Sequence, residues 1–292
     1  MAAMNPLTAP SRAEKPLIIY VCADTHLGDE NSGENLQAFA DVVNRNRPNF
    51  VLHCGDCIEA QKTQRYDGGS DREAALMQQK DFLRAWNSID ADIPHEIILG
   101  NHDVSTCHGN PSPMSEDDWI GPLGWEKRPA VGTSRAHAAL TINNGDIQAL
   151  AVLMCTRSSL YERDAVLKWV EDQVSGFNGD LILFADHTLE IYPDIRVLLL
   201  DMELKIPCLF LHGHYQGAPT GTRDARGLEK NGDHFPCWLQ SDMSRAPIFS
   251  IFELHRGSFT GQIELGGYHR IYEGNAGDNT VSPATINYRT SV

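Results

Sequence analysis

Short apolar segments alternate along the chain with longer segments of helical periodicity. Buried β-strands are predicted at residues 17–22, 50–53, 96–99, 147–154, 181–185, 208–211 and 248–254, where apolar and β-branched residues dominate. Helical spacing of apolar residues predicts helices around residues 36–43, 75–89 and 166–174. Because strands and helices alternate, we predict an α/β sandwich whose helices pack on largely buried sheets.

The chain has the length of one large domain or two small ones, at 292 residues. We predict a single domain over residues 16–268, preceded by a flexible, polar lead at residues 1–15 and followed by a C-terminal tail at residues 269–292. Stretches rich in Gly, Pro, Asp and Asn predict surface loops at residues 59–70, 104–135 and 216–236. Such long loops more often have a function than not, and the alternative is that they are mobile surface segments without one.

The net charge of −15 argues against a nucleic acid polymer as the main partner, because phosphate backbones are bound by clustered Lys and Arg. Small phosphorylated substrates remain compatible, since bound cations reverse the sign of the local field. No stretch approaches the ~20 apolar residues of a membrane span, and the N-terminus lacks the apolar stretch of a secretory signal. We therefore expect a cytoplasmic location and no membrane contact.

The seven cysteines fit a reducing compartment, because their number is odd and several lie in strand-like segments. Cys54 and Cys57 form a C-x-x-C pair, which leaves a zinc or redox site as an alternative. The chain contains no second C-x-x-C, so buried thiols are the preferred interpretation.

Polar residues with metal-binding side chains follow five of the predicted strands. They are Asp24 and His26, then Asp56, then Asn101 to Asp103, then Asp186 and His187, and finally His212 and His214. In open α/β sheets, sites form beyond the carboxyl ends of the strands, so these residues can converge. Carboxylate, imidazole and amide oxygen together suit Mn²⁺, Fe or Zn²⁺. Two such ions roughly 3.5–4 Å apart can hold a phosphoryl group, with Asp56 as a candidate shared ligand.

The order of these motifs resembles that of the calcineurin-like metallophosphoesterases. The chain has D-x-H at Asp24, G-D at Gly55, G-N-H-D from Gly100, a later lone His187 and a G-H pair at Gly213. The similarity spans residues 17–254. It implies a single-domain, four-layer αββα sandwich that holds two divalent metal ions, Mn²⁺, Fe²⁺/Fe³⁺ or Zn²⁺.

The resemblance also implies a role for each motif residue. The implied metal ligands are Asp24, His26, Asp56, Asn101, His187, His212 and His214. Asp24 and His26 would bind the first ion, Asn101 and His187 the second, and Asp56 both. His102 would protonate the leaving oxygen or stabilise its charge, and Asp103 would orient His102. A metal-bound hydroxide would attack phosphorus in line, without a phosphoenzyme.

The last motif departs from the G-H-x-H that is usual in the family. Aligned on Gly213, His214 is the first ligand and Gln216 replaces the second. Aligned on the histidines, His212 and His214 keep the required spacing, but Leu211 replaces the glycine. Ligand chemistry favours the two histidines, and Gln216 stays the alternative.

Structural interpretations stand beside the functional ones. Asp56 can be a turn residue, Asn101 a helix cap, and His187 a core histidine, because its surroundings differ from the usual family sequence. The remaining histidines outside the motifs, His53 and His137 among them, are expected to be structural or solvated.

We therefore predict hydrolysis of a phosphomonoester or phosphodiester, with a small molecule or a nucleotide as substrate. A protein phosphatase is less favoured, because the residues after Asp56 lack the basic and glycine residues of that branch. The rival from another class is a non-catalytic scaffold of the same fold, stabilised by metal. Such a scaffold would need neither His102 nor a nearly complete ligand set, and the presence of both in this chain argues against it.

Overall fold

A computed structural model describes residues 14–29, 31–62, 72–104, 112–157, 160–214, 237–240, 243–244, 247–256, 258–265 and 268–275. Gln216 and the loop predicted at residues 216–236 lie outside this part of the chain. Among the described residues, no helix is long and apolar enough to cross a membrane.

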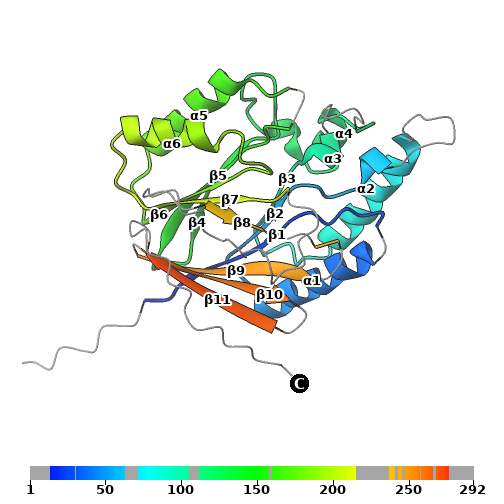
Figure 1. Cartoon of the computed structure of the whole chain (residues 1–292), viewed down its shortest axis with the longest axis horizontal. Coiled ribbons are helices and arrows are strands. Elements are labelled where there is room, and N and C mark those ends of the chain that lie inside the picture. The colour runs from blue at the N-terminus through cyan, green and yellow to red at the C-terminus, as the bar shows by residue number, and fades with distance from the viewer. Residues whose placement is uncertain are drawn as a thin grey trace, which may run out of the picture.

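Two β-sheets lie between helices (Figure 1). The first sheet has the order β11-β10-β9-β1-β2-β3, and the second has the order β4-β5-β6-β7-β8. The first consists of β1 (Leu17–Cys22), β2 (Phe50–Cys54), β3 (His95–Ile98), β9 (Ile248–His255), β10 (Ser258–Leu265) and β11 (Tyr268–Asn275). The second consists of β4 (Ala138–Asn143), β5 (Gln148–Leu153), β6 (Leu181–Ala185), β7 (Cys208–His212) and β8 (Cys237–Leu239). Strands β1, β2 and β3 are parallel to one another, as are β5 to β8.

Helices cover the outer face of each sheet. The first sheet packs on α1 (Ser32–Asn46) and α2 (Arg72–Trp86), and the second on α5 (Arg163–Ser175) and α6 (Tyr192–Asp201). Shorter helices are η1 (Ala60–Lys62), α3 (Asn101–Val104), α4 (Asp117–Ile120) and η2 (Trp125–Lys127). The predicted four-layer αββα sandwich is confirmed.

Strand residues divide between two cores with a period of two. In β1, Leu17, Ile19 and Val21 join the core between the sheets, whereas Tyr20 and Cys22 join the core under α1 and α2. A strand with both faces covered is apolar along its length. This explains why β1 was recognisable from its composition.

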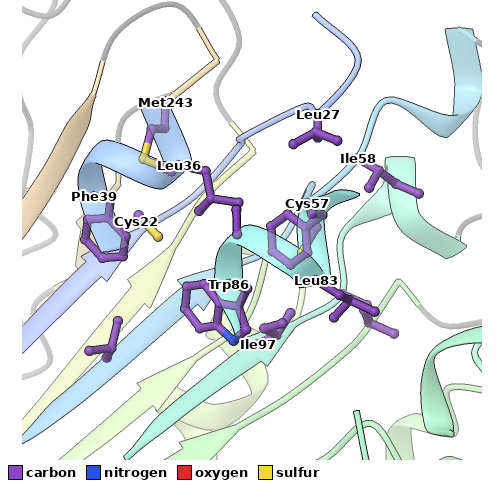
Figure 2. Close-up of a cluster of buried hydrophobic side chains, with 14 of the residues drawn as sticks. Cys22, Leu27, Leu36, Phe39, Cys57, Ile58, Leu83, Trp86, Ile97 and Met243 are labelled. Carbon is purple, nitrogen blue, oxygen red and sulfur yellow. The ribbon is translucent and has the colours of Figure 1, made fainter. Parts of the chain in front are cut away.

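The core under α1 and α2 lies directly beneath the loops that carry the candidate ligands. Figure 2 shows Leu36 and Phe39 of α1 together with Leu83 and Trp86 of α2, with Cys57 from the loop after β2 among them. These side chains are almost completely buried. The loop after β2 is therefore anchored in the apolar core as well as in the sheet.

The predicted strands and helices were found; strand ends are shifted by at most one residue, whereas helix ends are shifted by one to four residues. Strands β4, β8, β10 and β11 and helix α6 were not predicted. The domain was expected to end at residue 268, but β11 extends the first sheet to Asn275 by pairing antiparallel with β10. The stretch predicted as a loop at residues 104–135 contains α4 and η2.

Candidate metal centre

The candidate ligands lie on loops at the carboxyl ends of parallel strands in both sheets. They are Asp24 and His26 after β1, Asp56 after β2, Asn101 at the start of α3 after β3, His187 after β6 and His214 after β7. Parallel strands end at the same edge of a sheet, and the two sheets face each other. Residues far apart in sequence are thereby brought together.

One group of donors surrounds a single imidazole nitrogen. His187 Nε2 lies 3.2 Å from Asp56 Oδ2, 3.2 Å from Asn101 Oδ1 and 3.1 Å from His214 Nδ1. Two atoms bound to one ion at about 2.1 Å are roughly 3.0–3.4 Å apart. Asp56, Asn101 and His214 therefore each lie at the spacing from His187 Nε2 that ligands of one ion would have.

The hydrogen on the His187 ring is on the opposite nitrogen. His187 Nδ1 lies 2.7 Å from the carbonyl oxygen of Cys54, which can only accept a hydrogen bond. Nδ1 therefore donates, and the lone pair of the neutral ring is on Nε2, facing Asp56 and Asn101. A carbonyl partner of this kind is typical of metal-binding histidines.

A second, more open group is formed by Asp24, His26 and Asp56. His26 Nε2 lies 3.7 Å from Asp24 Oδ1 and 3.7 Å from Asp56 Oδ2. Asp56 Oδ2 thus lies close to ring nitrogens of both His26 and His187, with His102 Nε2 at 4.0 Å. This oxygen is placed where a ligand shared by two ions would be.

The buried carboxylates favour a bound cation. Asp24 and Asp56 are almost fully buried, and neither Asp24 Oδ1 nor Asp56 Oδ2 has a hydrogen-bond partner among the described residues. Burial raises the pKa of Asp24. Burial also works against ionisation of Asp56, but His187 and His26 outweigh it and hold its pKa far below the usual range. A buried carboxylate oxygen without a hydrogen-bond partner is costly, and a divalent cation would compensate it. The donor set therefore fits a metal centre.

The backbone at the centre is strained. Four candidate ligands have left-handed φ angles, namely Asp24 (53°), His26 (46°), Asp56 (53°) and His214 (67°). Such angles are unfavourable for residues other than glycine, and they concentrate at functional sites. The sandwich holds these loops in conformations that short peptides would avoid.

Comparisons with known proteins agree with this geometry. The sequence matches the calcineurin-like phosphoesterases over residues 17–214, most of the chain. The chain belongs to this family. Among solved structures, a dimetal phosphatase from Danio rerio shares the fold, with a TM-score of 0.60 at 10% identity, over 86% of this chain and 96% of that one.

Two other structures align less well. A purple acid phosphatase from yellow lupin (Lupinus luteus) seeds has a TM-score of 0.46 at 13% identity, over 92% of this chain and 53% of that one. GAP50, the anchor in the inner membrane complex of Plasmodium, also has a TM-score of 0.46, at 12% identity, over 94% of this chain and 90% of that one. No curated protein sequence matches the chain.

In this calcineurin-like phosphoesterase, two motif glycines lie where a side chain would not fit. A Cβ on Gly100 would lie 2.2 Å from Asp56 Oδ1, and a Cβ on Gly213 would lie 2.8 Å from Asp24 Oδ2. Both carboxylates are pressed against backbone, so larger residues would displace the candidate ligands. The close approach at Gly213 also identifies it as the glycine of the final motif.

The structure brings His214 rather than His212 to the candidate centre, which favours the alignment on Gly213 over the one that we preferred. The backbone N–H of His214 donates to Asp24 Oδ2 at 3.0 Å, and its ring contacts His187. His212 ends β7, and its Nδ1 donates to the carbonyl of Gly213. Within the described part of the chain, neither candidate metal group includes His212. Burial lowers its pKa to about 4.

A carboxylate that we had assigned to a loop connects His26 to His102. Glu59 is 2% exposed. Its Oε2 lies 3.0 Å from His26 Nδ1, and its Oε1 forms a hydrogen bond with His102 Nδ1. Burial works against its ionisation, but the two histidines outweigh this and lower its pKa. The signal in the sequence was an acid three residues after Asp56, at the start of a polar stretch that predicted a loop.

Asp103, which we expected to orient His102, has a different function in the fold. Its Oδ1 accepts the N–H of Ile58, and its Oδ2 accepts the N–H groups of Cys57 and Gly100. It thereby joins the loop after β2 to the turn after β3. Burial and the nearby Asp56 raise its pKa to about 6. The orienting contact of the His102 ring comes from Glu59 instead.

Cys54 and Cys57 do not support the alternative of a thiolate site. Both are buried free thiols, and burial raises the pKa of each. A thiolate would be needed for redox chemistry or zinc binding. They behave as core residues, as the preferred interpretation held.

Proposed function

We propose that this protein is a dinuclear-metal-dependent phosphoesterase that hydrolyses a phosphomonoester or phosphodiester of a small molecule or nucleotide. The observation that carries the proposal is the position of Asp56 Oδ2. It lies 3.2 Å from His187 Nε2 and 3.7 Å from His26 Nε2, between two groups of donors. Family membership supports the same reaction class.

The residues divide into two overlapping ligand sets. Asp24, His26 and Asp56 would hold one ion, and Asp56, Asn101, His187 and His214 would hold the other. Two divalent ions, Mn²⁺, Fe²⁺/Fe³⁺ or Zn²⁺, would supply a hydroxide for attack on phosphorus and would stabilise the charge on the phosphoryl oxygens.

His102 is suited to protonate the leaving oxygen. Glu59 holds its Nδ1, so Nε2 faces the centre, 4.0 Å from Asp56 Oδ2. The side chain is 11% exposed, which leaves it accessible to a substrate. As the phosphoester bond breaks, Nε2 would transfer its proton to the departing oxygen, and Glu59 would offset the positive charge of the ring beforehand.

The acidic net charge favours small substrates over polymers, because a polyanion would be repelled outside the immediate field of the metals. The choice between ester types is therefore best made experimentally, with a panel of cyclic nucleotides, nucleotide diesters and sugar phosphates.

The test uses protein reconstituted with Mn²⁺ and a chromogenic phosphomonoester and phosphodiester. His102→Ala should lower kcat by about 10²–10⁴-fold without changing metal content. His255→Ala, a histidine outside the centre, is the matched control and should retain activity. Turnover by His102→Ala equal to that of the wild type would remove the proposed role. Wild-type protein that binds metal without turnover on the whole panel would favour the scaffold.

A further inference from the structure

A buried histidine that is not a candidate ligand lies directly under the centre. His53, in β2, is 0% exposed. Its Nδ1 lies 3.2 Å from the backbone nitrogen of Gly55, and its Nε2 lies 2.6 Å from Thr25 Oγ1. A backbone N–H can only donate, so Nδ1 accepts this bond. The hydrogen of the neutral ring is then on Nε2, and Thr25 Oγ1 accepts it.

Both partners of His53 adjoin candidate ligands. Thr25 lies between Asp24 and His26, and Gly55 immediately precedes Asp56. The two loops also share backbone hydrogen bonds, from Asp24 N–H to the carbonyl of Gly55 at 2.9 Å and from His26 N–H to the carbonyl of Asp56 at 3.0 Å. The His53 ring adds a side-chain connection between the same two loops.

The core restrains this ring on its other faces. His53 contacts Phe82 edge-on at a centroid distance of 5.3 Å and Trp86 at 5.8 Å, and both belong to α2. Phe82 and Trp86 are themselves stacked, at 6.1 Å. The ring cannot tilt without disturbing this aromatic cluster or its contacts with Thr25, Gly55 and Cys57, whose Sγ lies 3.5 Å from Nδ1.

We propose that His53 is a positioning residue that sets the separation between the loop of Asp24 and His26 and the turn of Asp56. This inference rests on the proposed function, because that separation would determine whether Asp56 could belong to both ligand sets. It extends the set of functional residues to His53 and Thr25, neither of which is a candidate ligand.

The variants separate hydrogen bonding from packing. Thr25→Val removes the hydroxyl with little change in volume. His53→Phe retains a ring against Phe82 and Trp86 but removes both nitrogens. His137→Phe is the matched control, because His137 is also buried and accepts a backbone N–H, from Cys155 at 3.3 Å, and packs on Trp169. It adjoins none of the candidate ligands in sequence.

Three measurements are made on the full chain: Mn²⁺ affinity by calorimetry, the paramagnetic resonance signal of a coupled manganese pair, and the melting temperature. We expect Thr25→Val and His53→Phe each to weaken Mn²⁺ binding about 10–100-fold, the range typical of residues that orient ligands. The double variant should lose little more Mn²⁺ affinity than the stronger single variant, because both substitutions remove the same hydrogen bond between Thr25 and His53. The coupled signal should weaken in all three, and His137→Phe should change only the melting temperature.

The inference would be overturned if Thr25→Val and His53→Phe kept the Mn²⁺ affinity and the coupled manganese signal of the wild type and only lowered the melting temperature, as His137→Phe does. His53 would then be a core residue. Thr25→Val preserves the test if His53→Phe fails to fold. A wild-type protein that binds no Mn²⁺ would instead refute the proposed function and this inference with it. The two failures are therefore distinguishable.

Discussion

The two halves of the candidate centre are built differently. Around His187 Nε2, three donors from other loops lie within 3.2 Å, and they come from both sheets. Around His26 Nε2, the carboxylates of Asp24 and Asp56 lie 3.7 Å away, and all three residues follow strands of the first sheet. The half around His187 is thus preorganised at ligand spacing. The half around His26 is more open, so we expect its ion to bind more weakly.

The largest loss is expected from Asp56→Asn, because this residue belongs to both halves. The variant should fail to hold two ions and should lose roughly 10³-fold or more in kcat, since each factor of ten is 1.36 kcal/mol and metals supply several kcal/mol. Metal content by mass spectrometry and turnover of a chromogenic ester check this. Two tightly bound ions in the variant would contradict a shared ligand.

The next effect separates the halves. His214→Ala should weaken binding of the ion near His187 by about 100-fold and leave the other ion in place. His212→Ala should leave binding of both ions unchanged. Calorimetric titration with Mn²⁺ resolves the two events. A larger loss in His212→Ala would restore the alignment on the two histidines and remove Gly213 as the motif glycine.

A smaller effect is expected at the residue that joins His26 to His102. Glu59→Gln keeps the size of the side chain but removes its charge, so kcat should fall about 10-fold and the ion near His26 should bind more weakly. Glu116→Gln is the control, because Glu116 is a buried acid that binds Ser134 and Arg135 instead. Equal losses in both variants would indicate general destabilisation.

The smallest effect is a pH dependence that differs between the metal-free and metal-bound protein. Burial disfavours the charged form of His187, but Asp56 outweighs it and raises the pKa to about 9 in the metal-free protein. The pKa of an unfolded histidine is about 6.5. The stabilisation of the folded protein by protonated His187 is therefore fully present below about pH 6.5 and is lost as the pH rises through about 9.

The melting temperature with a chelator should accordingly fall across this pH window, and Mn²⁺ should reduce the fall because the metal replaces the proton. His187→Gln, measured without metal, should flatten the dependence. An identical fall in that variant would assign the effect to other groups.

Much of this arrangement was predictable, and the reasons are physical. Strands covered on both faces are apolar throughout, so β1, β2 and β6 were recognisable, and the polar residues at their ends could be placed at one edge of the sheets. Strand β11 was missed because its sequence, YHRIYEGN, mixes polar and apolar residues at the edge of the sheet. Helix α6 was missed because two of its apolar residues, Val197 and Leu200, are exposed.

The partners of the site residues were less predictable than their positions. Which carboxylate reaches His102 depends on how the loop after β2 folds; the resemblance pointed to Asp103, whereas Glu59 makes the contact. Similarly, His212 and His214 have the same chemistry. The approach of Gly213 to Asp24 and the contact of His214 with His187 distinguish them.

The left-handed backbone of four candidate ligands limits how this centre can be transferred. Copying Asp24, His26, Asp56 and His214 onto the strand ends of another sheet would supply the donor atoms but not the turns that aim them. An unconstrained chain would relax to right-handed or extended angles and turn the side chains away. Engineering this centre into a new scaffold therefore requires grafting whole turns, with their glycines and buried supports, as units.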